Sequence, residues 1–230
     1  MATIPAAARD PWRRERSEKG VTPDHCQGQP RRVAAPEKAS SRPLKKPLVF
    51  GVNELRTRRL AGTPAAPGDI ADIHRLHGDS RVMATLSGDG ETLSREDSLI
   101  FLDRAAEHWK LHGFGLWVFR EHVGGDFVGY GGIKHAVIEG RDEIELAYAI
   151  RSDRWGKGFA TELSIAALKL GFDLIHLDRI VAITLPHNLA SRGVMEHCGF
   201  TYQRDIVHAG LPHVLYLLEA RNFVARRDKF

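Results

Sequence analysis

The pattern of apolar and polar positions predicts a domain with a run of antiparallel strands in its middle. Apolar residues are concentrated in the segments 114–120, 127–137 and 143–150, each of which has the length and residue types of a strand. Short connections rich in glycine and aspartate, 123–126 and 139–142, separate these segments. Strands joined by such turns are usually hairpin neighbours, so we expect the three to be antiparallel. Further strands are predicted over 55–60, 180–184, 200–207 and 212–219.

Helical spacing of apolar residues predicts four helices between these strands. The first is short and lies around 70–76. The second begins at Ser94, which with the acids after it is typical of a helix N-terminus, and ends at Gly113. The other two follow the strands that end at 150 and 184, and the last one stops at Gly199. The fold class expected from this order is mixed α/β (α+β).

Charge divides the chain into an extension and a domain. Residues 1–46 carry 11 of the 33 basic and 5 of the 29 acidic residues, so the remainder has a slight acidic excess. The same segment has few large apolar residues to offset the entropy of ordering. We expect a disordered basic extension over 1–46, a folded domain over 47–222 and a tail over 223–230. Clustered cations attract polyanions, so contact with RNA or the ribosome is one hypothesis for the extension, and a solvated segment is the other.

Cysteine content and hydropathy indicate the kind of cellular compartment in which the protein works. Cys26 and Cys198 are the two cysteines, and they form neither a disulfide framework nor a zinc-binding motif. No apolar run approaches the roughly 20 residues that a membrane span requires. His108 and His112 have the helical spacing of metal ligands, but no third ligand accompanies them, so we expect no metal. These features are typical of a cytoplasmic protein that does not bind membranes.

A glycine-rich turn is the strongest candidate for chemistry. The strand Ile144–Ile150 leads through Arg154–Thr161 into a helix. Free N–H groups and the dipole at such a helix N-terminus favour a phosphate group. Lys157 is not followed by Ser or Thr, so the turn is no Walker loop, and Thr161 stands where a dinucleotide fingerprint would have its third glycine.

Three short motifs resemble the GCN5-related N-acetyltransferase (GNAT) family, and within it the branch of the ribosomal-protein N-terminal acetyltransferases. They are Trp155–Glu162, Asn188–Ser191 and Glu196–Phe200, and the resemblance covers about residues 50–220. It implies a mostly antiparallel mixed sheet of about seven strands with four helices, splayed between the fourth and fifth strands. It also implies acetyl transfer from acetyl-CoA to an amine.

The resemblance assigns the donor to the turn and its surroundings. Trp155 stands where the family has Gln or Arg, which leaves the backbone cradle of the turn intact but removes one side-chain contact. The charges of Arg154 and Lys157 are expected near the pyrophosphate. The residues expected to bind acetyl-CoA are Tyr148, Ala149, Ile150, Trp155, Gly156, Lys157, Gly158, Phe159, Ala160, Thr161, Asn188 and Ser191.

Catalysis is expected to depend on Glu145 and Ser191. The family often places a glutamate on this strand as a base that works through water, and the alternative for Glu145 is a solvent-facing carboxylate. Strand alternation puts Glu145 on the face of Ala147 and Ala149. Relatives often supply a tyrosine at the position of Met195 to protonate the thiolate, so here Ser191 or water is expected to donate.

The acceptor stays open at the level of sequence. A protein N-terminus, a polyamine and an aminoglycoside-like amine are all compatible, as is a monomer or a homodimer. A non-catalytic acyl-CoA-binding module is the alternative to an enzyme. His187, His197, His208 and His213 are close enough along the chain to line an acceptor pocket, although surface or packing roles are expected for each.

Overall fold

The computed structural model describes residues 53–224. The predicted basic extension 1–46, the start of the predicted domain and residues 225–230 of the predicted tail lie outside this range. No helix of the described part is long and apolar enough to cross a membrane.

A single eight-stranded sheet forms the centre of the domain, in the order β1-β2-β3-β4-β5-β6-β8-β7. All neighbouring strands are antiparallel except β5 and β6, which are parallel. The strands are β1 (Leu55–Arg56), β2 (Leu60–Pro64), β3 (Leu116–Glu121), β4 (Phe127–Ile138), β5 (Arg141–Ile150), β6 (Arg179–Thr184), β7 (Thr201–His208) and β8 (Leu211–Glu219).

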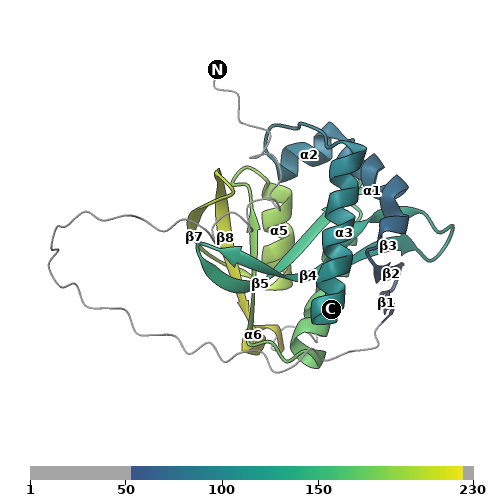
Figure 1. The fold of residues 1–230 in the computed structure, drawn as a ribbon. Helices are drawn as coiled ribbons and strands as arrows, with labels where there is room; N and C mark the ends of the chain where they lie inside the picture. The colour runs from purple at the N-terminus through teal and green to yellow at the C-terminus, as the bar shows by residue number, and fades with distance from the viewer. Residues whose placement is uncertain (1–52, 225–230) are drawn as a thin grey trace, which may run out of the picture.

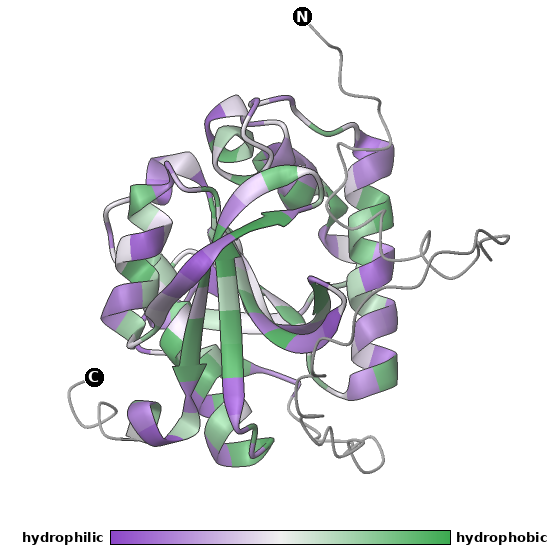
Figure 2. Cartoon of the chain, turned by 90° about the vertical axis from the view of Figure 1, so that its left-hand side faces the viewer, coloured by the Kyte–Doolittle hydropathy of each residue, from purple (hydrophilic) through white to green (hydrophobic). Residues whose placement is uncertain are grey.

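Helices cover both faces of the sheet (Figure 1). On one face, α1 (Ile70–His77), α2 (Ser80–Leu86) and α3 (Arg95–His112) pack on β3, β4 and β5. On the other face, α4 (Phe159–Lys169), α5 (Leu189–Cys198) and α6 (Ala220–Val224) pack on β4, β5, β6 and β8. Figure 2 shows apolar strands in the interior and helices whose polar residues alternate with apolar ones, as expected for helices with one buried face.

The fold class is confirmed, with two corrections in the count of elements. The predicted first strand 55–60 is a hairpin of β1 and β2, because the N–H of Thr57 donates to the carbonyl of Leu60 and turns the chain. This gives eight strands in place of seven. α2 and α6 were not predicted because they are short, and their apolar residues are too few to show a period.

The ends of α3 agree with the prediction from sequence. Ser94 Oγ accepts a hydrogen bond from the Asp97 N–H at 3.0 Å, while the Asp97 carboxylate accepts from the Ser94 N–H. Gly113 ends the helix in the left-handed conformation. This reciprocal capping fixes the helix start, and glycine permits the sharp exit at its end.

The predicted boundary between domain and tail falls inside α6. Its Phe223 is fully buried, with its ring 5.1 Å from that of Phe172. The folded part therefore continues past 222, because this aromatic side chain completes the core on the α4 face.

The sheet is weakly joined between β5 and β6. Within the described residues, their pairing consists of one register pair, Glu145 with Val181, whereas β4 and β5 pair along ten positions. Beyond Glu145 the strand β5 continues to Ile150 as a neighbour of β4 alone. The splay expected between the fourth and fifth predicted strands is present here.

Candidate active site

A cleft of about 500 Å³ opens where β5 and β6 separate. One end lies at the turn before α4 and the other at β8, so the cleft connects the two faces of the sheet. Twelve of the thirteen predicted site residues line it, and Lys157 is the exception. Lys157 is exposed and is next in sequence to the lining residues Gly156 and Gly158. That it binds acetyl-CoA stays a prediction.

The turn at the first end is shaped by two glycines with left-handed backbones. Gly156 has φ 73° and Gly158 has φ 77°, a conformation that residues with a Cβ rarely adopt. Gly158 is the N-cap of α4, and its carbonyl accepts from the Glu162 N–H at 3.1 Å. The N–H groups of 159–161 precede the first intrahelical bond, so they are available to an anion.

Arg59 braces this turn from behind, although nothing in the local sequence pointed to it. Its Nε donates to Glu162 at 2.6 Å, and its Nη1 donates to the Lys157 carbonyl at 2.9 Å. The guanidinium also stacks 4.3 Å from the Phe159 ring centroid. A trans peptide points its N–H opposite to its carbonyl, so holding the Lys157 carbonyl directs the Gly158 N–H away from Arg59.

Glu162 is the centre of this brace. Its carboxylate accepts from Thr57 Oγ1 at 2.6 Å and from the Arg59 backbone N–H at 2.7 Å, in addition to Arg59 Nε. Burial raises the pKa of Glu162, but these hydrogen bonds and the Arg59 charge outweigh it and leave the pKa lowered. The acid in the first turn of α4 thus stays ionised, and Arg59 balances its charge.

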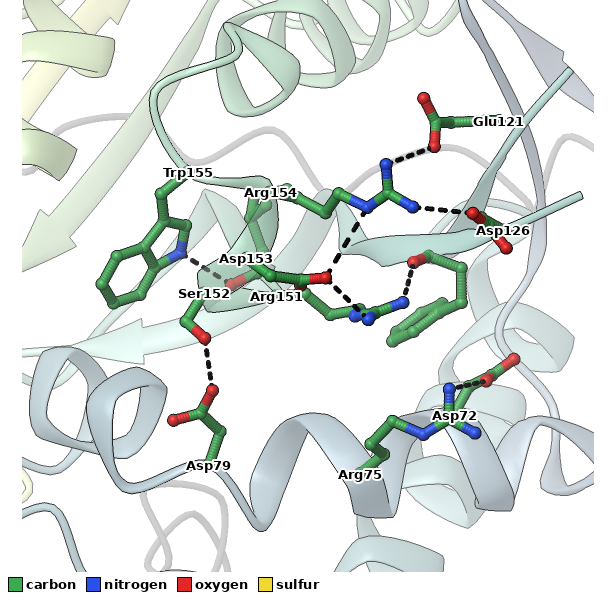
Figure 3. A network of polar contacts seen from close by, with 12 residues as sticks. Asp72, Arg75, Asp79, Glu121, Asp126, Arg151, Ser152, Asp153, Arg154 and Trp155 are labelled. Atoms are coloured by element: carbon green, nitrogen blue, oxygen red, sulfur yellow. Dashed lines mark hydrogen bonds and ion pairs between the residues drawn. The ribbon is translucent and has the colours of Figure 1, made fainter. Parts of the chain in front are cut away.

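Arg154 lines the cleft, but its guanidinium is also paired with carboxylates of the fold, and the expectation that its charge lies near the pyrophosphate stays a prediction. Its guanidinium binds Glu121 at 2.8 Å and Asp126 at 2.7 Å (Figure 3). Trp155 is tied as well, because its Nε1–H donates to the Ile150 carbonyl at 2.8 Å, while 44% of the residue remains exposed. Trp155 therefore holds the end of β5 against the turn.

The backbone of β5 points alternately at β4 and into the cleft. The Arg151 N–H donates to the Val128 carbonyl on β4, so residues of the same parity, Ala147 and Ala149, also face β4. Tyr148 and Ile150 have the opposite parity, so the N–H groups of both and the carbonyl of Tyr148 face the cleft, while the Ile150 carbonyl accepts from Trp155. Ala149 also lines the cleft, although its N–H and carbonyl face β4.

Tyr148 and Ser191 form a hydroxyl pair on the α5 side of the cleft. The Tyr148 Oη lies 3.0 Å from Ser191 Oγ and 3.2 Å from the Ser191 carbonyl. Burial raises the pKa of Tyr148, so the phenol stays protonated. Asn188 is the N-cap of α5, accepting from the Ser191 N–H at 3.1 Å and donating to the Thr85 carbonyl. Met195 is 1% exposed and belongs to the apolar cluster against which Tyr148 packs.

The other end of the cleft holds a nearly buried ion pair. Lys134 Nζ lies 2.7 Å from Glu145 Oε2, and their side chains are 8% and 12% exposed. Glu145 lies on the face of Ala147 and Ala149, as strand alternation predicted. Its predicted alternative, a solvent-facing carboxylate, does not fit a side chain this buried. Lys134 could not be recognised from sequence, since only the register of β4 against β5 places it opposite Glu145.

Two histidines complete this end. His208 and His213 line the cleft, and their ring centroids are 5.8 Å apart. The surface or packing roles expected for these two histidines therefore do not describe them fully. His197 and His187 are not among the lining residues. His213 belongs to the β8 row of Leu215 and Leu217, which faces the same side of the sheet as Glu145.

His108, one of the two histidines near the end of α3, serves the fold. His108 Nδ1–H donates to the Phe114 carbonyl at 2.9 Å, and Nε2 accepts from the His135 N–H at 3.0 Å. Both ring nitrogens of His108 are therefore occupied. The described part of the chain contains no group of three or more side chains placed to hold a metal ion.

Comparisons with known proteins agree with this geometry. Residues 59–201 match the family model described as the acetyltransferase (GNAT) domain. The match covers more than half of the chain, so the protein belongs to the GNAT family, as the resemblance from sequence indicated.

Individual relatives are more distant. An uncharacterised Bacillus subtilis protein, YkkB, is 31% identical over 113 residues, which cover 49% of this chain and 66% of YkkB. The chain spans less than two thirds of the length of the curated relatives that it matches.

Two solved structures illustrate the shared fold. A GNAT-family acetyltransferase from Bordetella pertussis has a TM-score of 0.63 at 23% identity, covering 71% of this chain and 98% of that one. RimL, the ribosomal L7/L12 alpha-N-protein acetyltransferase in complex with coenzyme A, has a TM-score of 0.60 at 14% identity, covering 72% and 97%. At these identities the likeness concerns the fold alone.

Proposed function

We propose that the protein is an N-acetyltransferase that moves an acetyl group from acetyl-CoA to a primary amine in a ternary complex. The observation that carries this proposal is the cleft through the splayed sheet. It has a phosphate-binding turn at one end and ionisable side chains at the other, on opposite faces of β5. A donor and an acceptor entering from the two ends would meet beside Tyr148.

The donor end has the features that a coenzyme A thioester needs. The N–H groups of 159–161 suit the pyrophosphate, and Gly156 and Gly158 let the backbone approach it closely. The backbone groups of Tyr148 and Ile150 that face the cleft suit the amide groups of the pantetheine arm. The N–H of Tyr148 or Ile150 is also placed to stabilise the negative charge that develops on the thioester oxygen.

The acid–base groups divide between the two ends. The Tyr148–Ser191 pair lies at the donor end, where Ser191 would protonate the departing thiolate and would regain a proton, through Tyr148, from the nitrogen of the acylated amine. At the acceptor end, the predicted base Glu145 and the imidazoles of His208 and His213 are each able to accept the amine's proton.

The acceptor is a peptide N-terminal amine or a small-molecule amine. RimL is named for acetylating the α-amine of a ribosomal protein, which supports a peptide acceptor by analogy of fold. A ribosomal acceptor would agree with the hypothesis that the basic extension 1–46 contacts RNA or the ribosome. This hypothesis predicts that deleting 1–46 weakens salt-sensitive ribosome association and leaves acetyl-CoA affinity unchanged.

Calorimetry with acetyl-CoA tests the donor site. Gly158→Glu should abolish binding, because a residue with a Cβ is strained at φ 77° and the added side chain would start beside Arg59, where its carboxylate disturbs the brace of the turn and adds negative charge near the phosphate site. Gly140→Glu is the matched control, since Gly140 has φ 72° in an open turn between β4 and β5. Equal loss in both variants, or no binding by the wild type, would contradict the proposal.

Turnover separates an enzyme from a binding module. The acceptor panel contains a peptide with a free N-terminus, a polyamine and an aminoglycoside. At least one of these amines should release free thiol from acetyl-CoA. Tight acetyl-CoA binding without thiol release on any amine would favour the non-catalytic module.

A further inference from the structure

The acceptor end of the cleft contains more acid–base groups than amine acetylation with one base requires. Glu145, Lys134, His208 and His213 come from four different strands and interact electrostatically with one another. The attacking amine arrives mostly as an ammonium ion, so one group must attract this cation and one group must remove its proton.

Glu145 is better suited to attraction than to proton removal. Its Oε2 lies 2.7 Å from Lys134 Nζ, so one carboxylate oxygen is already occupied by a cation. Catalysis of proton transfer is most efficient when the pKa of the base lies near the working pH. Imidazole meets that condition more closely than a carboxylate.

His213 has the geometry of a neutral base. Its Nδ1 lies 3.1 Å from the Leu211 carbonyl, which can only accept, so Nδ1 carries the proton in the neutral ring. The lone pair of Nε2 is then the free acceptor of this ring. His213 is 8% exposed and lines the cleft, so its position is fixed by the strand that carries it.

The surroundings of His213 favour the neutral ring in the free protein and stabilise the charged ring after it accepts a proton. Burial lowers the pKa of His213, while the Leu211 carbonyl and the Glu145 carboxylate act in the opposite direction. The ring is neutral before the acceptor binds, and Glu145 stabilises the imidazolium once it forms. Burial also lowers the pKa of His208; Glu145 acts in the opposite direction there too, while His213 and Lys134 lower the pKa further.

We propose that His213 Nε2 removes the proton from the acceptor ammonium and that Glu145, held by Lys134, attracts this cation and stabilises the imidazolium. This rests on the proposed N-acetyltransferase function. The ammonium loses one proton to His213, the neutral amine nitrogen bonds to the thioester carbon, and the C–S bond breaks. The second proton of the amine goes to the thiolate, and His213 returns the first to solvent, so acetamide, thiol and one proton are the products.

The test compares two acceptors in one variant. His213→Asn keeps an N–H that can donate to the Leu211 carbonyl, so it preserves the local hydrogen bond and removes the base. With the alkylamine that gives the highest wild-type rate, we expect kcat/KM to fall by about 100-fold or more, and the dependence on a group titrating below the ordinary histidine pKa to disappear. With acetohydrazide, whose amine is neutral at pH 7, we expect a loss of less than about threefold, because no base is needed.

Controls separate the possible outcomes. His197→Asn alters an exposed histidine of α5 outside the cleft and should leave both rates and acetyl-CoA affinity unchanged. An unchanged rate in His213→Asn would overturn the proposal, as would an equal loss with both acceptors, which indicates a structural role. The melting temperature and the acetyl-CoA affinity of His213→Asn show whether the variant is folded, and a misfolded variant is replaced by His213→Gln. Absence of acetyl transfer by the wild type would instead contradict the N-acetyltransferase function itself.

Discussion

Arg59 shows how a residue distant in sequence can determine the shape of a binding turn. It is not among the residues that line the cleft, and it holds the Lys157 carbonyl and the Glu162 carboxylate. Its effect on a ligand is therefore indirect, through the direction of the Gly158 N–H. The sequence motif around Gly158 predicted the turn, but only the tertiary structure brings Arg59 to it.

Arg59→Gln should weaken acetyl-CoA binding by about tenfold. The substitution removes two hydrogen bonds to charged or carbonyl groups, and such bonds contribute about 1.5–3 kcal/mol when an ion takes part. Calorimetry measures the loss, with Arg58→Gln as control because Arg58 is an exposed neighbour. An unchanged affinity for acetyl-CoA in Arg59→Gln would show that the turn keeps its shape without the brace.

Several site residues could be predicted and others could not, for a physical reason. The turn from Trp155 to Thr161 and the helix cap Asn188 are local, so their spacing in the sequence identifies them. Lys134 reaches the cleft only through strand register, which a single sequence does not contain. His208 and His213 were named from sequence together with two other histidines, and only the structure shows that these two line the cleft. The carboxylate of Glu145 was found, but its ion pair was not.

At the level of elements, α3 and β4 are joined by an unusual side-chain bridge. β4 continues past Gly132, where its pairing with β3 ends, and the backbone N–H of His135 is then satisfied by the His108 ring. The ring holds the Phe114 carbonyl with its other nitrogen. This arrangement requires neutral His108, because protonated imidazole has no acceptor.

Stability should therefore fall in mild acid. Burial lowers the pKa of His108 to about 3 and that of His77 to about 4, both below the 6.5 of an unfolded histidine. Below pH 6.5 the unfolded state binds protons that the folded state does not, so stability decreases as the pH falls through this window. Chemical denaturation at pH 7 and pH 5 should show a loss of about 1–2 kcal/mol per histidine.

His108→Leu provides the corresponding check. This variant should be less stable at pH 7, because the His135 N–H loses its partner. It should also show a smaller difference between pH 7 and pH 5, since one titrating group is gone. A pH dependence equal to that of the wild type would assign the acid sensitivity to other residues.

Element prediction succeeded where local signals were strong. The long helix α3 has both a capping box and a left-handed glycine, and its ends match the prediction. The β1–β2 hairpin was missed because its turn uses Thr57 and not glycine, asparagine or proline. α2 is a seven-residue helix, which is too short for periodicity to distinguish it from a loop.

At the scale of the whole molecule, ligand binding should stabilise the fold. The cleft is lined by β5 and β6 together with α2, α4 and α5, so an occupant in contact with all of them is bound only by the folded state. Acetyl-CoA at 100 times its dissociation constant adds about 2.7 kcal/mol. For a domain of this size the melting temperature should rise by roughly 5–10 °C.

Thermal unfolding with and without acetyl-CoA measures this shift. Gly158→Glu should show no shift at the same ligand concentration, while Gly140→Glu should respond like the wild type. A similar shift in Gly158→Glu would mean that acetyl-CoA binds elsewhere.

The parity of β5 has a consequence for hydrogen exchange. The amides of Ala147 and Ala149 point at β4, and those of Tyr148 and Ile150 point into the cleft. In the free protein, neighbouring amides of one strand should therefore exchange with deuterium at alternating rates, slow for the alanines and fast for Tyr148 and Ile150. Acetyl-CoA should selectively slow the exchange of the Tyr148 and Ile150 amides, so that the whole strand becomes protected. Such protection would show that the donor pairs with β5 as an extra strand of the sheet would.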